Sequence, residues 1–143
     1  MIPAARFRTV RRRAAGGFTD RKASRSTGYT IGSSSYTEMA LDTIDPGHPA
    51  TTLVSGGIQV NYTGNIKVVL DCTTQAAASG YQQLFLPYVN DVASSATANA
   101  GTRGVRHAEW TIPVVSGDVV SIYASRTGTS SVDAGATVLI TLP

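Results

Sequence analysis

Apolar and polar residues alternate with a period close to two through most of the chain from residue 52 onward. Between residues 66 and 72 one set of alternating positions is apolar: Ile66, Val68, Leu70 and Cys72. The positions between them are Lys67, Val69 and Asp71. Successive side chains of a strand point to opposite faces, so a strand buried on one face has this pattern. The alternation therefore predicts a body built from short, half-buried strands.

Further extended segments follow one another at a spacing of roughly ten residues, which is typical of a sandwich or barrel of antiparallel strands. We expect strands over residues 29–31, 36–44, 58–62, 66–72, 81–90, 105–112, 119–126 and 136–142. Segments rich in Gly, Pro, Asp and Ser separate them, at 45–49, 63–65, 93–104 and 116–118. Pro87 lacks a backbone donor and predicts an edge strand or a bulge. No segment has the length and pattern of an amphipathic helix. The expected fold class is all-β, an antiparallel β-sandwich or jelly roll.

Charge divides the chain into two parts. The net charge is +3, but residues 1–25 carry eight basic residues and one acid, whereas residues 26–143 carry four basic residues and eight acids. The basic side chains of the first part are Arg6, Arg8, Arg11, Arg12, Arg13, Arg21, Lys22 and Arg25. We expect a basic N-terminal arm and linker over residues 1–28 and a single folded domain over residues 29–143.

Three interpretations of the basic arm remain open. A targeting signal is disfavoured because no apolar stretch follows Arg11–Arg13. Nucleic-acid packaging is a second interpretation, since closely spaced guanidinium groups neutralise phosphates and release counterions. The third is an anchor that docks on a larger assembly, for which arginine is suited because it binds carboxylates through two parallel hydrogen bonds.

The chain has few cysteine and histidine residues, which are common in metal and catalytic sites. Cys72 is the single cysteine and His48 and His107 are the only histidines, so a zinc site of several ligands is hard to assemble. His107 and Glu109 match the first part of a zinc-deaminase motif, but no pair of cysteines follows. Neither a G-x-S-x-G nucleophile turn nor a phosphate-binding glycine loop occurs. We expect a non-enzyme without cofactor or metal. No apolar run is long enough to span a bilayer, so we expect no membrane insertion.

Three motifs resemble the tumour-necrosis-factor/C1q-like jelly roll. The segment 63–70 (TGNIKVVL) is similar to the family's G-x-Y-x-V strand, and 88–91 (YVND) resembles a strand that ends in a polar turn. The segment 112–123 (IPVVSGDVVSIY) resembles the family's L-x-x-G-D-x-V-x-[IV] stretch. Within it, Gly117 is expected to adopt a positive φ and Asp118 to bond back to a nearby amide.

The resemblance implies a jelly roll that forms a homotrimer by packing aromatic and aliphatic side chains around a threefold axis. Aromatic residues expected in the trimer contact or the core are Tyr62, Phe85, Tyr88, Trp110 and Tyr123. Small domains of this kind with a short N-terminal arm resemble phage virion components, namely minor tail proteins, head fibres and capsid decoration proteins.

The expected function is that of a virion structural protein, assembled in the host cytoplasm. Its arm would attach to capsid or tail proteins, and its exposed loops, 93–104 and 127–134, are candidate contacts for a host-surface ligand. The alternative is a jelly-roll coat protein whose arginine-rich arm packages nucleic acid.

Overall fold

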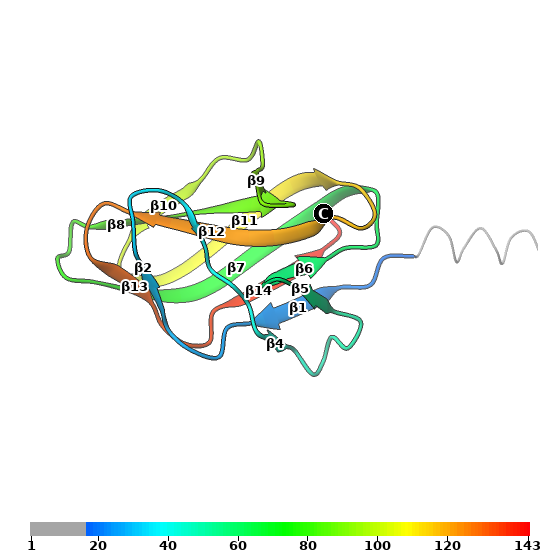
Figure 1. The fold of residues 1–143 in the computed structure, drawn as a ribbon, viewed down its shortest axis with the longest axis horizontal. Helices are drawn as coiled ribbons and strands as arrows, with labels where there is room; N and C mark the ends of the chain where they lie inside the picture. The colour runs from blue at the N-terminus through cyan, green and yellow to red at the C-terminus, as the bar shows by residue number, and fades with distance from the viewer. Residues whose placement is uncertain (1–16) are drawn as a thin grey trace, which may run out of the picture.

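The fold is a sandwich of two antiparallel sheets in a computed structural model that describes residues 17–143 (Figure 1). The first sheet contains β1 (Arg21–Ser24), β2 (Tyr29–Ile31), β4 (Thr43–Ile44), β7 (Gly64–Ala76), β11 (Gly104–Val114), β13 (Ser130–Val132) and β14 (Thr137–Thr141). The second contains β3 (Thr37–Glu38), β5 (Thr52–Val54), β6 (Gly57–Gln59), β8 (Gln82–Val89), β9 (Val92–Ala93), β10 (Asn99–Thr102) and β12 (Val119–Arg126). The expected all-β jelly-roll class is confirmed.

The long strand β7 organises the first sheet. It pairs with β11 along one side, and with β14 and then β13 along the other. Beyond them, β1 pairs with β14, β2 pairs with β13, and β4 pairs with β1. In the second sheet, β12 lies between β8 on one side and the short strands β6 and β3 on the other.

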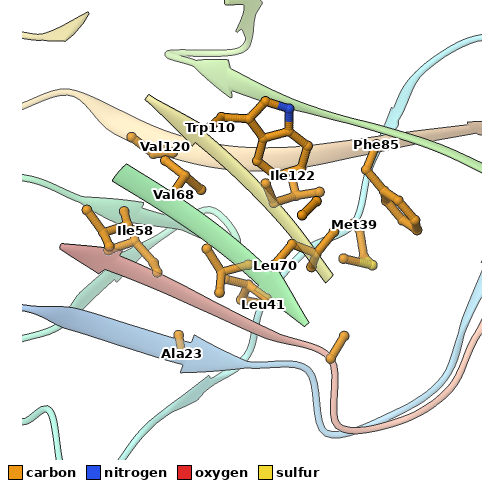
Figure 2. Close-up of a cluster of buried hydrophobic side chains, with 14 of the residues drawn as sticks. Ala23, Met39, Leu41, Ile58, Val68, Leu70, Phe85, Trp110, Val120 and Ile122 are labelled. Carbon is orange, nitrogen blue, oxygen red and sulfur yellow. The ribbon is translucent and has the colours of Figure 1, made fainter. Parts of the chain in front are cut away.

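The core lies between the two sheets and is formed by the alternating apolar positions (Figure 2). Along β11 every second residue from Arg106 to Val114 is buried and the residues between them are exposed. Strand β7 contributes Val68 and Leu70, while Phe85 of β8 and Ile122 of β12 come from the second sheet. The face that the sequence alternation assigned to residues 66–72 of β7 is therefore the face observed.

The Gly117–Asp118 turn has the conformation expected from the sequence. Gly117 has a φ of 99°, and the Asp118 carboxylate accepts a hydrogen bond of 2.8 Å from the Val115 amide. This turn leads directly into β12.

The sheet begins earlier than the boundary placed at residue 28. Strand β1, at Arg21–Ser24, pairs with β14 and β4, and Ala23 is fully buried. The boundary is therefore corrected to a point before Arg21. The segment 21–24 has two basic residues and only one apolar residue, so its buried face could not be recognised from hydrophobic alternation.

Three other expectations differ from the structure. The segment 127–134, expected as an exposed loop, contains β13, which pairs with β2 and β7 and in which Ser130 and Val132 are buried. The segment 93–104, expected as a loop, contains β10, which pairs with β8. Pro87 lies inside the second sheet instead of at its edge, since β8 has partners on both sides. It pairs with Ile122 of β12, and on the other side it falls between the start of β10 and the end of β9, where the missing donor is tolerated.

None of the described residues, 17–143, forms a helix that is long and apolar enough to cross a membrane.

Candidate functional site

The residues expected to form the basic anchor fall into two groups. Arg6, Arg8, Arg11, Arg12 and Arg13 lie outside the described residues. The remaining three, Arg21, Lys22 and Arg25, belong to β1 or follow it directly.

Arg21, in β1, and Arg25, directly after it, are fixed within the folded body. Arg21 is buried and its guanidinium donates to the carbonyl of Ala50. Arg25 donates to the carbonyl of Ala40 at 2.8 Å, and its guanidinium lies 5.0 Å from the centre of the Tyr29 ring. Both side chains hold surrounding loops against the first sheet, so among the described residues they are not free to act as an anchor.

Of the five aromatic residues singled out in the sequence, Phe85 and Trp110 lie in the core. Phe85 is fully buried, and Trp110 is 7% exposed with its indole N–H donating to the carbonyl of Thr97 at 2.9 Å. Tyr62 is only partly buried and packs edge-to-face against Phe18, with ring centres 5.3 Å apart. These three residues contribute to the packing of the single chain.

The other two aromatic residues, Tyr88 and Tyr123, form a surface cluster. They project from β8 and β12 on the face of the second sheet opposite the core, and their rings stack 3.7 Å apart with an interplanar angle of 4°. Tyr36, just before β3, lies 6.3 Å from Tyr88. All three are neither fully buried nor fully exposed. We call the surface formed by Tyr36, Tyr88 and Tyr123 the tyrosine face.

Two carboxylates adjoin the tyrosine face. Asp91 accepts a hydrogen bond of 3.0 Å from the Tyr123 hydroxyl. Glu38 pairs with Tyr123 across β3 and β12, and its Oε2 is buried without a hydrogen-bond partner. Burial raises the pKa of Glu38, and the nearby Asp91 carboxylate raises it further. Burial and the bond to Asp91 raise the pKa of Tyr123 to about 12.

An open hollow of about 200 Å³ lies beside these carboxylates. Its lining residues come from the β5–β6 turn, the β8–β9 turn and β12, and are Val54, Ser55, Asn90, Asp91, Val119 and Ser121. Three of them, Ser55, Asn90 and Asp91, have left-handed backbones with φ between 49° and 62°. Asn90 and Asp91 form the two-residue connection between β8 and β9, where positive φ matches the twist of the hairpin. The tyrosine face therefore ends in a polar, partly enclosed depression.

A second cluster of charged residues lies on the opposite side of the molecule, on the outer face of the first sheet. The His107 ring contacts two carboxylates, with Nδ1 2.5 Å from Asp71 and Nε2 2.7 Å from Glu109. Lys67 Nζ lies 3.0 Å from the second oxygen of Glu109. His107 and Glu109 share one face of β11, which is the arrangement expected from their spacing in a strand.

We expect the pKa of His107 to lie above its ordinary value of 6.5, because hydrogen bonds to Glu109 and Asp71 favour the protonated ring. Its contribution to the free energy of unfolding should be complete below pH 6.5 and should disappear as the pH rises through the raised folded value. Titration of His107 by NMR checks this, and Glu109→Gln should lower the His107 pKa. A titration midpoint at or below 6.5 would contradict the assigned contacts.

The buried end of β8 carries a polar network between the sheets. The Arg106 guanidinium donates to the carbonyl of Gln83 at 3.1 Å and to the Asn99 side chain at 2.6 Å, and it lies over the Phe85 ring. The Gln83 side chain also bonds to Thr74 and Ser130. Burial lowers the pKa of Arg106. The neutral acceptors of Gln83 and Asn99 satisfy the buried guanidinium charge of Arg106. The network also links the ends of the two sheets.

The sequence alone did not identify Tyr36, Glu38, Asn90 and Asp91 as members of one surface. They come from segments more than fifty residues apart, and the pairing of β12 with both β3 and β8 brings them together. The Asn90-Asp91 dipeptide was recognised as a turn, but its proximity to Tyr123 depends on sheet register.

No protein-family model and no curated protein sequence matches the chain. Solved structures do resemble it. The Eiger TNF of S. frugiperda aligns with a TM-score of 0.61 and 13% identity, over 88% of this chain and 93% of that one. Murine APRIL aligns with a TM-score of 0.57 and 8% identity, over 86% of this chain and 98% of that one.

The PRD1 vertex protein P5 is similar to a comparable extent, with a TM-score of 0.55 and 16% identity over 85% of this chain and 92% of that one. At such low identities the similarity concerns the fold. Together with the two facing antiparallel sheets, these alignments show a jelly-roll fold over most of the chain that is similar to the fold of the TNF proteins.

Proposed function

We propose that the chain is a non-enzymatic structural protein of a phage virion, a trimeric jelly-roll module that its basic N-terminal segment attaches to the capsid or tail. The observation that carries this proposal is a TNF-like jelly roll combined with a separate cluster of positive charge. Residues 1–16 carry five arginines and no acid, whereas residues 17–143 carry seven basic and nine acidic residues. The resemblance to the PRD1 vertex protein supports a place in a virion.

Incorporation into particles tests the attachment. We expect the full chain to be present in purified particles from the cells that encode it, and a chain lacking residues 1–16 to be lost from them. The deletion ends before β1, so it leaves the described body intact. Quantitative mass spectrometry of purified particles measures the occupancy. Incorporation of the shortened chain at full occupancy would contradict an N-terminal anchor.

The open edge of the first sheet is the surface we propose for contact between copies. Strand β11 is eleven residues long and pairs on one side only, with β7. Val105 on this strand is 87% exposed, the largest exposure among the large hydrophobic side chains of the described residues. A long unpaired edge presents backbone donors and acceptors that can pair with another chain.

Val105→Asp should therefore convert the trimer to single chains. A threefold contact would bury three uncompensated carboxylates, and each costs several kcal/mol. Sedimentation velocity measures the change in mass. The matched control is Val92→Asp, which places the same charge at a 66% exposed position on β9 of the second sheet. A trimer that survives Val105→Asp would exclude this edge as the contact.

Nucleic-acid packaging is the second candidate, and the five arginines of residues 1–16 favour it. Its test is the dependence of RNA or DNA affinity on salt, since the logarithm of the binding constant falls in proportion to the number of phosphates neutralised. A steep fall of affinity with salt concentration that disappears on deleting residues 1–16 would favour packaging. An affinity that does not depend on salt would exclude packaging.

A further inference from the structure

Tyr88 and Tyr123 hold their rings face to face on the outer surface of the second sheet. The ring centres lie 3.7 Å apart and the ring planes differ by 4°. The contact joins two neighbouring strands, because Tyr88 of β8 lies opposite Ser121 of β12 and Tyr123 lies opposite Leu86. Among the aromatic pairs within residues 17–143, it is the only stacked one. Carbon atoms of the two rings are therefore in van der Waals contact.

Solvent reaches the stacked rings, whereas other readily oxidised side chains of residues 17–143 lie in the core. Tyr88 and Tyr123 are both partly exposed. In contrast, Met39 is fully buried, Trp110 is 7% exposed and Cys72 is 8% exposed. Burial raises the pKa of the Cys72 thiol to about 11, so little of the reactive thiolate is present at neutral pH. An oxidant that attacks from solvent would therefore meet the tyrosines first.

The Tyr123 hydroxyl also has a proton acceptor in place. It donates a hydrogen bond of 3.0 Å to the Asp91 carboxylate. A phenol that loses one electron also releases its hydroxyl proton, and a carboxylate at hydrogen-bond distance can receive that proton. Tyr123 can thus become a neutral phenoxyl radical while its ring remains stacked on Tyr88.

We propose that the Tyr88–Tyr123 pair is a modification site, at which hydrogen peroxide, used by a haem peroxidase, joins the two rings as a dityrosine. Each tyrosine loses one electron and its hydroxyl proton. The two radicals couple through ring carbons next to the hydroxyl groups and form one carbon–carbon bond. The hydrogen on each coupled carbon then leaves as a proton, and each phenolic oxygen takes up a proton. One peroxide molecule accepts the two electrons and the two released protons and becomes two molecules of water.

The new bond would tie β8 to β12 and close a loop that contains β9, β10 and β11. A covalent crosslink stabilises a fold chiefly because it restricts the unfolded chain. The chain has a single cysteine, so a disulfide within it cannot supply this restriction. The inference concerns the single chain and does not rest on the proposed function.

Peptide mapping of the full chain after treatment with hydrogen peroxide and a haem peroxidase tests the site. Trypsin separates the two rings, because Tyr88 lies in peptide 68–103 and Tyr123 lies in peptide 107–126. We expect these peptides to be joined, at the sum of their masses less two hydrogen atoms, in material that migrates as a single chain under denaturing conditions. Absence of the joined peptides, or their presence only in species of two or more chains, would overturn the proposal.

Substitutions by phenylalanine test which tyrosines react. Tyr88→Phe and Tyr123→Phe should each abolish the joined peptides, because phenylalanine has no hydroxyl group to oxidise. The matched control is Tyr81→Phe, which removes a tyrosine that is 36% exposed and lies in the same tryptic peptide as Tyr88. It should leave the yield of joined peptides unchanged. Joined peptides that persist in Tyr88→Phe or Tyr123→Phe, or that disappear in Tyr81→Phe, would contradict the assignment.

Urea denaturation of the treated chain tests the consequence of the bond. We expect the crosslinked full chain to unfold at a higher urea concentration than the untreated chain, and treated Tyr88→Phe to unfold at the same concentration as untreated Tyr88→Phe. An unchanged midpoint in the crosslinked chain would exclude a stabilising role.

Discussion

A chain lacking residues 1–25 is expected to unfold or aggregate, whereas a chain lacking residues 1–16 is expected to fold like the full protein. The longer deletion removes β1, which lies between β14 and β4 in the first sheet. It removes the fully buried Ala23 and the bonds of Arg21 and Arg25 to the loops around them. It also leaves β14 as an unpaired edge, which favours association between strands.

Circular dichroism and urea denaturation of the two shortened chains measure this difference. Domains of this size are stable by about 5–15 kcal/mol, so the loss of a paired strand is a large fraction of the total. The chain lacking residues 1–16 is the control for the removal of positive charge. A cooperative transition at an unchanged urea midpoint in the chain lacking residues 1–25 would contradict the assignment of β1 to the sheet.

Trp110→Ala is expected to lower the free energy of unfolding by about 3–5 kcal/mol. Trp110 is 7% exposed at the centre of β11, directly opposite Val68 of β7, and its ring fills the space between the sheets (Figure 2). The substitution removes most of the buried side chain. It also removes the indole N–H that donates to the Thr97 carbonyl.

The conservative variant Trp110→Phe is the comparison. It keeps a six-membered aromatic ring in the core and removes the five-membered ring of the indole with its N–H, so the expected loss is smaller than that of Trp110→Ala. Urea denaturation with an unchanged slope measures both values. A loss of less than about 1 kcal/mol for Trp110→Ala would contradict the place of Trp110 in the core.

The parts of the fold that could be predicted are those in which every second residue is apolar. Strand β7 has this property between residues 66 and 72, and its buried face was assigned correctly. The Gly117–Asp118 turn was also predictable, because its conformation depends on two adjacent residues. In both cases the information is local in the sequence.

Strands β1 and β10 were missed because their pairing is decided by distant partners. The β1 sequence, RKAS, buries an arginine whose guanidinium bonds to a loop thirty residues away in the chain. The β10 sequence, NAGT, has little β propensity and is held by its pairing with β8. Neither β propensity nor the alternation of apolar and polar residues predicts either strand.

The candidate site depends even more on tertiary structure. Tyr123 was singled out in the sequence, but its neighbours Glu38 and Asp91 belong to strands or turns that only sheet register brings together. Glu38 and Asp91 were indistinguishable in sequence from solvated surface acids. What sets them apart is a buried oxygen without a partner and a hollow beside it.

Self-association of the jelly roll is the central claim, and the mass of the purified full chain in solution tests it most directly. Size-exclusion chromatography with light scattering should give three times the mass of the 14.9 kDa chain. The threefold ratio of measured mass to chain mass should persist on dilution through the micromolar range, and the chain lacking residues 1–16 should give three times its own, smaller mass. A mass equal to one chain under these conditions would contradict the account.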